Sequence, residues 1–169
     1  FGGSTSAYFQ PNVDVGKTAG KLVNDVTISA TDGSAASASA TAGAAGIVSG
    51  SGAVATAEVT SGVSATMGSG AEVVAQDDVS VTAEATPETS AEAKGVSVGA
   101  GSVGASLATA STTSNVVARI DSGATISGDK LDVVARRLVG SSPTTAAQAF
   151  GASGGVLFGI NATLAKATS

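Results

Sequence analysis

A short stretch in which apolar and polar side chains alternate occurs three times along the chain. The copies span 25–31, 78–84 and 130–136, and they begin 53 and 52 residues apart. The apolar side chains take every second position: Val26, Ile28 and Ala30, then Val79, Val81 and Ala83, then Leu131, Val133 and Ala135. This two-residue period is typical of a β-strand with one buried face. Its recurrence in phase predicts a stacked array of repeats.

Other segments recur at the same offset. Residues 54–57 match 107–110, and residues 67–73 match 120–126. In the third unit we align residues 159–163 with the segment that begins at Gly104, which requires a two-residue insertion. Corners that contain glycine lie between the expected strands, at 68–70, 121–123 and 127–129. Glycine supplies the positive φ that such tight bends need.

The chain therefore divides into four parts of one continuous solenoid. Residues 1–24 fit the repeat poorly and are interpreted as the end of a preceding coil or a cap. Residues 25–77 form the first repeat, 78–129 the second, and 130–169 a partial third. The chain begins with Phe1 and the third copy stops early at Ser169, so we expect a fragment of a longer protein.

No segment shows the sustained apolar stripe of an amphipathic helix. The alanine-rich run 35–45 also contains Ser, Thr and Gly, which weaken a helix by up to about 1 kcal/mol per residue. The pattern predicts an all-β fold, a right-handed parallel β-helix (β-solenoid) of repeats of about 53 residues. One coil of that length would have a contour of about 175 Å. That is wide for an interior of Ala and Val, so we favour two or three coils per repeat.

Composition narrows the function. Most of the 43% hydrophobic content is Ala and Val, and only 3% of the 169 residues are aromatic. The net charge of −5 argues against nucleic acid as a partner. The absence of His and Cys removes the commonest general base, disulfides and thiolate chemistry. No run of about 18 uncharged apolar residues resembles a membrane-spanning helix.

The cycle of a 78–83 strand (Asp-Val-Ser-Val-Thr-Ala), a Gly/Ala/Ser-rich middle at 95–108 and a closure at 118–126 resembles the repeats of very large bacterial exoproteins. These are the filamentous-haemagglutinin-like and leukotoxin-like adhesins. The resemblance covers residues 25–169 and lies in pattern and composition. It implies a right-handed parallel β-helix shaft, secreted or at the bacterial cell surface. It offers no catalytic residues, and the nonapeptide calcium repeat of another exoprotein class does not occur.

Two groups of residues invite a chemical interpretation. The glycine-rich segment 99–104 lacks the spacing and following helix of a dinucleotide fingerprint, so corner or close-packing glycine is favoured. Carboxylates gather at Asp77, Asp78, Asp129 and Asp132. Calcium binding or hydrolysis is the alternative there, but we favour a turn-capping role.

Three further motifs remain. Arg136 and Arg137 form an anion site or, as we favour, a solvated outer face. Outward threonines, which in ordered ranks can match ice, are interrupted by other residues; these are Thr27, Thr31 and Thr82. Asn161 begins a glycosylation sequon, a motif frequent by chance. We assign no catalytic, cofactor-binding or metal-binding residue.

The sequence thus favours a structural or adhesive shaft segment of an exported bacterial protein, without catalysis. Its expected partners are a host or surface glycan or protein receptor, neighbouring repeats of the parent chain, and copies associating end to end. The alternatives are a carbohydrate- or surface-binding module and, less favoured, a polysaccharide-degrading enzyme on the same fold. One Tyr and no Trp leave few aromatic side chains to stack on sugars.

Overall fold

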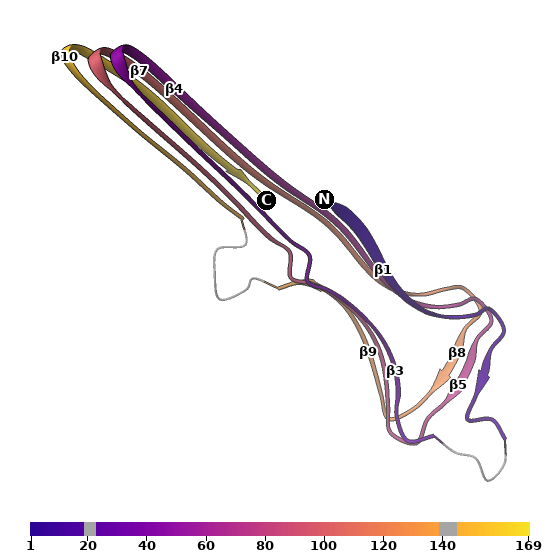
Figure 1. Ribbon diagram of the computed structural model, residues 1–169. Coiled ribbons are helices and arrows are strands. Elements are labelled where there is room, and N and C mark those ends of the chain that lie inside the picture. Colours follow the sequence, from indigo (N-terminus) through magenta and orange to yellow (C-terminus); the bar gives the residue numbers. More distant parts are fainter. Residues whose placement is uncertain (19–22, 139–144) are drawn as a thin grey trace.

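The structure is a computed structural model that describes residues 1–18, 23–138 and 145–169. Within these ranges the regular secondary structure consists of β-strands, without a helix (Figure 1). Segments 19–22 and 139–144 of the predicted units lie outside the described residues. The strands are β1 (Gly2–Phe9), β2 (Asp14–Val15), β3 (Val26–Asp32), β4 (Ala35–Met67), β5 (Glu72–Val74), β6 (Asp78–Ala85), β7 (Glu88–Ile120), β8 (Thr125–Ser127), β9 (Lys130–Arg137) and β10 (Thr145–Thr168).

The strands form three sheets in which every pairing is parallel. Their orders are β1-β4-β7-β10, β2-β5-β8 and β3-β6-β9. Each sheet therefore takes one strand from each successive level of the chain (Figure 1). The prediction of an all-β fold with parallel sheets is confirmed.

The register of the strands follows the sequence repeat. Val26 pairs with Val79, and Val79 pairs with Leu131. Val54 pairs with Leu107, and Met67 with Ile120, as the matching segments predicted. Because neighbouring strands are one whole repeat apart, the preference for two or three coils per repeat is wrong. That preference assumed that the chain encloses a core of roughly circular cross-section. In the structure, much of each repeat forms two long runs of strand that pack against each other.

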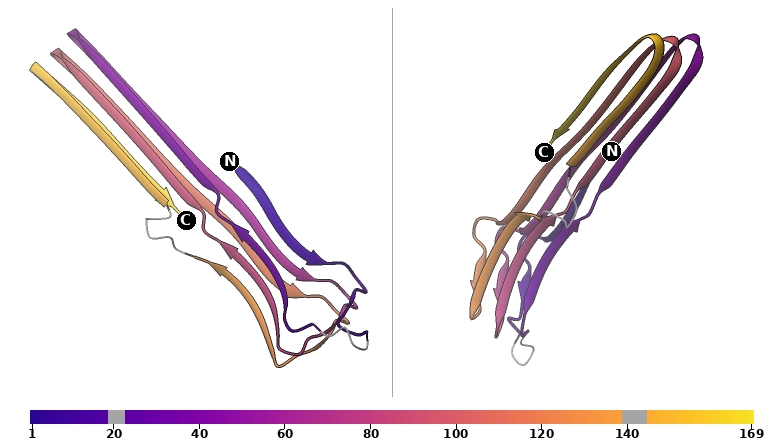
Figure 2. Two further views of the ribbon diagram at one scale, coloured as in Figure 1. Left: turned by 60° about the horizontal axis from the view of Figure 1, so that its bottom comes forward. Right: turned by 90° about the vertical axis from the view of Figure 1, so that its left-hand side faces the viewer.

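These two runs belong to β4, β7 and β10, each of which reverses direction at its far end (Figures 1 and 2). In β7 the runs meet closely: the hydroxyls of Thr89 and Thr112 are hydrogen-bonded at 2.6 Å. A Cβ added at Gly95 would lie 2.7 Å from Ser106 Oγ. We call residues 35–59, 88–112 and 145–168 the distal arms, and the other described residues the proximal body.

The proximal body contains the larger core. Its buried side chains come from all three sheets, because the inward positions of each strand face the same interior. Met67, Val63, Val79 and Val81 are at most 2% exposed. Ile120 and Ile126 pack against the same cluster. Burial of one such side chain stabilises the fold by about 1.5–3 kcal/mol.

The distal arms have a thinner core made of alanine. The inward residues of the two runs pack methyl against methyl: Ala53, Ala55, Ala57, Ala91, Ala93, Ala108 and Ala110. Nearer the tip the inward positions change to serine and glycine, including Ser97, Ser102 and Gly104. Only very small side chains fit between backbones that approach so closely.

The third level differs from the prediction in two ways. Leu131 and Val133, expected to be buried, are 47% and 44% exposed, because β9 has a strand beside it on one side only. The alignment of Gly159 with Gly104 is wrong, since Gly104 pairs with Asn161 and Gly159 with Ser102. The register shifts between Gly155 and Phe158, and sequence similarity between the repeats does not reveal this shift.

Two of the three predicted corners have the expected positive φ, whereas Gly128 in the corner at 127–129 does not and instead packs closely against the Asp77 carbonyl, where a Cβ would lie 2.9 Å from the oxygen. Gly70 and Gly123 have φ of 67° and 76°, in the left-handed region that favours glycine. In the preceding level Asn12 takes the same role with φ of 57°, and its backbone N–H donates to the Ser69 carbonyl at 2.9 Å. Residues upstream of the first repeat also pair in parallel: Gly2 lies beside Thr60, and Asp14 beside Glu72.

Candidate functional site

A depression on the outer face of the proximal body brings together an aromatic ring, a cation and a carboxylate. Tyr8, Thr66 and Arg119 are register partners on β1, β4 and β7. Alternation along each strand sends these side chains outward, while Phe9 and Met67 point into the core. The depression has a volume of about 330 Å³ and is lined also by Gln10 and Asp121.

The cation and the carboxylate of this depression form an ion pair. Arg119 Nε lies 3.2 Å from Asp121 Oδ1, and the Tyr8 side chain is 60% exposed. An exposed ring and an ion pair that line one depression offer a stacking surface and hydrogen-bonding groups, the combination that sugars use. Sequence inspection missed this group because Tyr8 and Arg119 are 111 residues apart and meet only through the register of three strands.

The predicted carboxylate sites occupy a corner before β3, β6 and β9. The backbone forms a ladder there: Asp77 N–H donates to the Asn24 carbonyl at 2.9 Å, and Asp129 N–H to the Asp77 carbonyl at 2.8 Å. Asp25 Oδ1 accepts a hydrogen bond from Asp78 N–H at 3.2 Å. The side chain that caps this corner is therefore that of Asp25, and the turn-capping role of the Asp77, Asp78 and Asp129 carboxylates stays a prediction.

The third level brings a cation to the same corner. Lys130 takes the register position of Asp78 and forms an ion pair with Asp132. The hydrogen bond to Asp132, together with the charges of Asp132 and Asp78, raises the pKa of Lys130. Over the described ranges, no three His, Cys, Asp or Glu side chains are grouped so that they could hold a metal ion.

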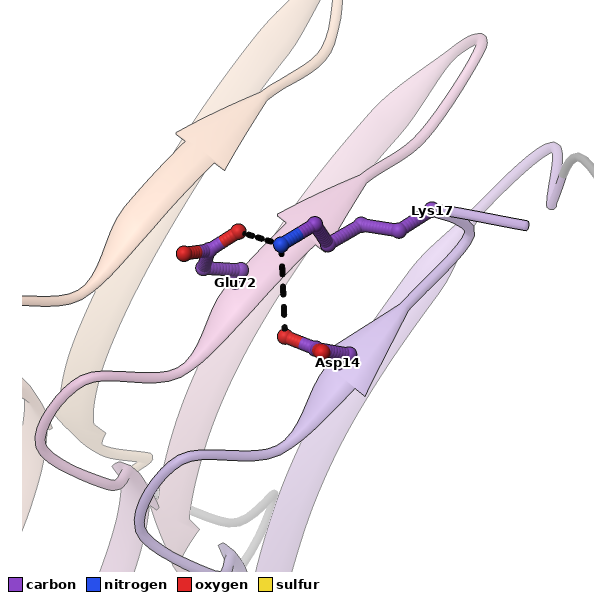
Figure 3. Close-up of polar contacts among 3 residues, drawn as sticks. All are labelled: Asp14, Lys17 and Glu72. Carbon is purple, nitrogen blue, oxygen red and sulfur yellow. Dashed lines mark hydrogen bonds and ion pairs between the residues drawn. The ribbon is translucent and has the colours of Figure 1, made fainter. Parts of the chain in front are cut away.

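A second exposed ion cluster links β2 and β5 (Figure 3). Lys17 pairs with Glu72 and lies 3.7 Å from Asp14. The hydrogen bond to Glu72 is the main reason that the pKa of Lys17 is raised. Because all three side chains are largely exposed, solvent screens the cluster, and we assign it a minor role in holding the corner.

Arg136 and the threonines lie on the outer face of β3, β6 and β9. Arg137 is exposed, but it takes the register position of the buried Ala85, so the prediction of an outer face for both arginines is wrong for Arg137. Arg136 Nε donates to Glu84 Oε1 at 2.7 Å, across one level. This contact agrees with a solvated face for Arg136. Thr31 stands in the same register position as Glu84, and Thr27 in that of Ser80. The threonines therefore form no continuous rank here.

The glycine-rich segment 99–104 lies at the tip of the distal arm of β7. A Cβ added at Gly99 would lie 2.2 Å from the Gly46 carbonyl oxygen of the neighbouring level. Close packing of backbone is thus confirmed as the reason for this glycine. The Asn161 sequon lies in β10, where the Asn161 amide occupies the space in which a Cβ at Gly151 would sit, 2.3 Å from its Oδ1. A glycan on Asn161 would have to move this side chain.

Comparisons with protein-family models, with curated proteins and with solved structures found no match. In the ranges that the structure describes, no helix would reach across a lipid bilayer.

Proposed function

We propose that this chain is a structural and adhesive segment of an exported bacterial protein, built as a right-handed parallel β-helix. The observation that carries the proposal is the register: strands one repeat apart lie side by side in all three sheets. Such stacking extends in one direction with each added repeat, which suits a shaft. A right-handed course agrees with the general handedness of parallel crossovers.

Electron microscopy of a chain with many copies of this repeat tests the shaft. We expect a thin rod whose length grows by about 4.8 Å per repeat. A compact particle, or a length that does not increase with repeat number, would contradict the proposal. The adhesive part is tested separately, by coating beads with the protein and measuring their retention on bacterial and host cell surfaces.

The second candidate is a carbohydrate-binding module, and the Tyr8 depression favours it. A glycan array should show binding that Tyr8→Ala abolishes and Tyr8→Phe keeps, because stacking needs the ring and not the hydroxyl. Thr60→Ala, on the outer face of the same sheet, is the matched control. Equal binding by Tyr8→Ala and the unchanged protein would remove this site from consideration. Release of reducing sugar from any glycan would instead favour the enzyme hypothesis.

A further inference from the structure

The outer faces of the distal arms carry large apolar side chains. On β7, Val96, Val98 and Val103 are 42%, 54% and 48% exposed. β7 has a hydrogen-bonded strand on both sides, so these side chains are exposed through the face of the sheet and not through an open edge. A strand with one face in water normally has the opposite arrangement, with polar residues outside.

The inner face of the same segment is polar. Ser97, Ser102 and Ser106 are 0%, 0% and 4% exposed, and their hydroxyls, like that of Ser51, have no hydrogen-bond partner. Buried unpaired hydroxyls weaken a fold in water. Two separate observations thus agree: near the tip, the inside and the outside are exchanged relative to the proximal body.

Each arm runs out from the proximal body to a bend and then returns. On the run that returns, the outward residues form four consecutive apolar ranks, and each rank holds one residue from each of β4, β7 and β10 in register. The ranks are Val48, Gly101 and Phe158; Gly50, Val103 and Ile160; Gly52, Ala105 and Ala162; and Val54, Leu107 and Leu164. The six residue-to-residue steps from the first rank to the last span about 20 Å. The last two ranks line a shallow groove of about 300 Å³. The next rank is polar and consists of Thr56, Thr109 and Lys166.

The tips carry no charge. Residues 33–57, 95–118 and 145–165 contain no Asp, Glu, Lys or Arg. Apolar side chains also lie at the bend of the arms, where Ile47 and Leu157 are 83% and 79% exposed, and on the run that leads out to the bend. The apolar surface therefore surrounds the tip, and a partner with one flat face would cover only part of it.

A second copy of the chain fits this surface poorly. Four ranks of three strands give a face of about 20 by 14 Å. Across the three levels described, two such faces would bury about 600 Å², below the roughly 1,200 Å² of a stable protein interface, and the apolar side chains at the bend and on the other face of the arm would stay uncovered. A fluid apolar medium has no such minimum and closes around every side of a tip.

We propose that the tips of the distal arms insert among the acyl chains of a lipid layer. The apolar ranks reach about 20 Å, comparable to one leaflet of a hydrocarbon core about 30 Å thick. The Thr56 and Thr109 rank then lies at head-group level. Lys166 in that rank and Lys94, which is paired with Glu92, lie at the base of the charge-free tips. Because the chain as a whole has a net charge of −5, we expect it to favour a zwitterionic layer over an anionic one. This surface is separate from the Tyr8 depression and goes beyond the shaft role.

Single tryptophans test the insertion, because the chain has none of its own. Val103→Trp places the probe in an apolar rank, and Thr113→Trp places the matched control outward on the same strand, nearer the proximal body. With phosphatidylcholine vesicles, Val103→Trp emission should shift to the blue and be quenched by brominated acyl chains, while Thr113→Trp should not change. Equal responses of the two probes, or no response from either, would overturn the proposal.

Vesicle flotation tests the ranks themselves. The triple variant Val54→Ser, Leu107→Ser and Leu164→Ser should bind vesicles at least about tenfold more weakly, because three apolar side chains no longer enter the lipid. Thr56→Ser with Thr109→Ser is the control and should bind unchanged. Circular dichroism checks that both variants keep their strands. Absence of flotation by the unchanged protein overturns lipid insertion, and concentration-dependent association without flotation would assign the face to a second copy.

Discussion

The proximal body and the distal arms share one strand register but differ in what lies between their sheets. In the proximal body, Val, Ile and Met side chains from three sheets meet in one core. In the distal arms, alanine methyls meet between two runs of one strand. A methyl group buries far less apolar area than an isoleucine side chain. Strands in the same parallel register can therefore enclose either a wide core of large side chains or a thin core of alanine. The size of the inward side chains decides which core forms.

The largest effect is expected from a charge in the proximal core. Val81 is fully buried, so Val81→Asp leaves a carboxylate without a partner and should lower the free energy of unfolding by about 3–5 kcal/mol. Thr82→Asp, on the outer face of the same strand, should change it by less than about 0.5 kcal/mol. Thermal melting followed by circular dichroism compares the two. Equal melting temperatures would show that the inside and outside of β6 are misassigned.

Overpacking should distinguish the two interiors. Ala93 is fully buried between the runs of β7, and Ala93→Val adds two methyl groups where backbones approach closely. We expect a loss of about 1–3 kcal/mol. Thr56→Val, outward on β4, is the control and should be close to neutral. Urea denaturation measures both, and a neutral Ala93→Val would mean that the arms separate more easily than their contacts indicate.

Removing a buried hydroxyl should have the opposite sign. Ser102 is fully buried and its Oγ has no partner, so Ser102→Ala should stabilise the protein by about 1 kcal/mol. Thr89→Ala, which breaks the 2.6 Å bond to Thr112, should destabilise it by a similar amount. Urea denaturation in aqueous buffer tests the contrast. Destabilisation by Ser102→Ala would indicate that the hydroxyl finds a partner in solution.

The smallest effect is expected at the exposed ion cluster. The raised pKa of Lys17 means that its contribution is complete below the ordinary lysine value of 10.5 and is lost as the pH rises through the raised value. Lys17→Met should therefore differ from the unchanged protein by a constant, small amount at pH 6–9, and the difference should vanish at strongly alkaline pH. Thermal melting across this range measures it. A difference that changes between pH 6 and 9 would show that another group titrates at this corner.

Much of the fold could be predicted from the sequence because the apolar phase repeats. Val26, Val79 and Leu131 keep the same parity, and that parity sets both the buried face and the register. The path of the chain between these strands could not be predicted in the same way. Ala-Ser-Gly runs have little contrast between inside and outside, so periodicity does not show where β4 and β7 turn back.

The candidate site was harder to predict. Asp77 and Asp78 stood out because they are adjacent in sequence, but at their corner they donate backbone N–H groups and the capping side chain is that of Asp25. Tyr8 and Arg119 meet only because β1, β4 and β7 stack in parallel, and no local motif indicates that meeting. The apolar ranks escaped notice for a different reason. Val54, Leu107 and Leu164 look like core residues until the arms are seen to bury alanine instead.

The register shift between Gly155 and Phe158 has a consequence for how such a chain can be altered. The extra length there is absorbed where the chain turns, and the strand pairs on both sides of the turn remain intact, from Thr145 with Thr89 to Thr168 with Ser111. The bend of β10 is therefore a permissive position for peptide insertion, whereas the bend of β7 is closely packed against the neighbouring level at Gly99. An epitope tag grafted at the β10 bend would be displayed at the far end of the arm while the strand pairs on both sides of the bend stay in place.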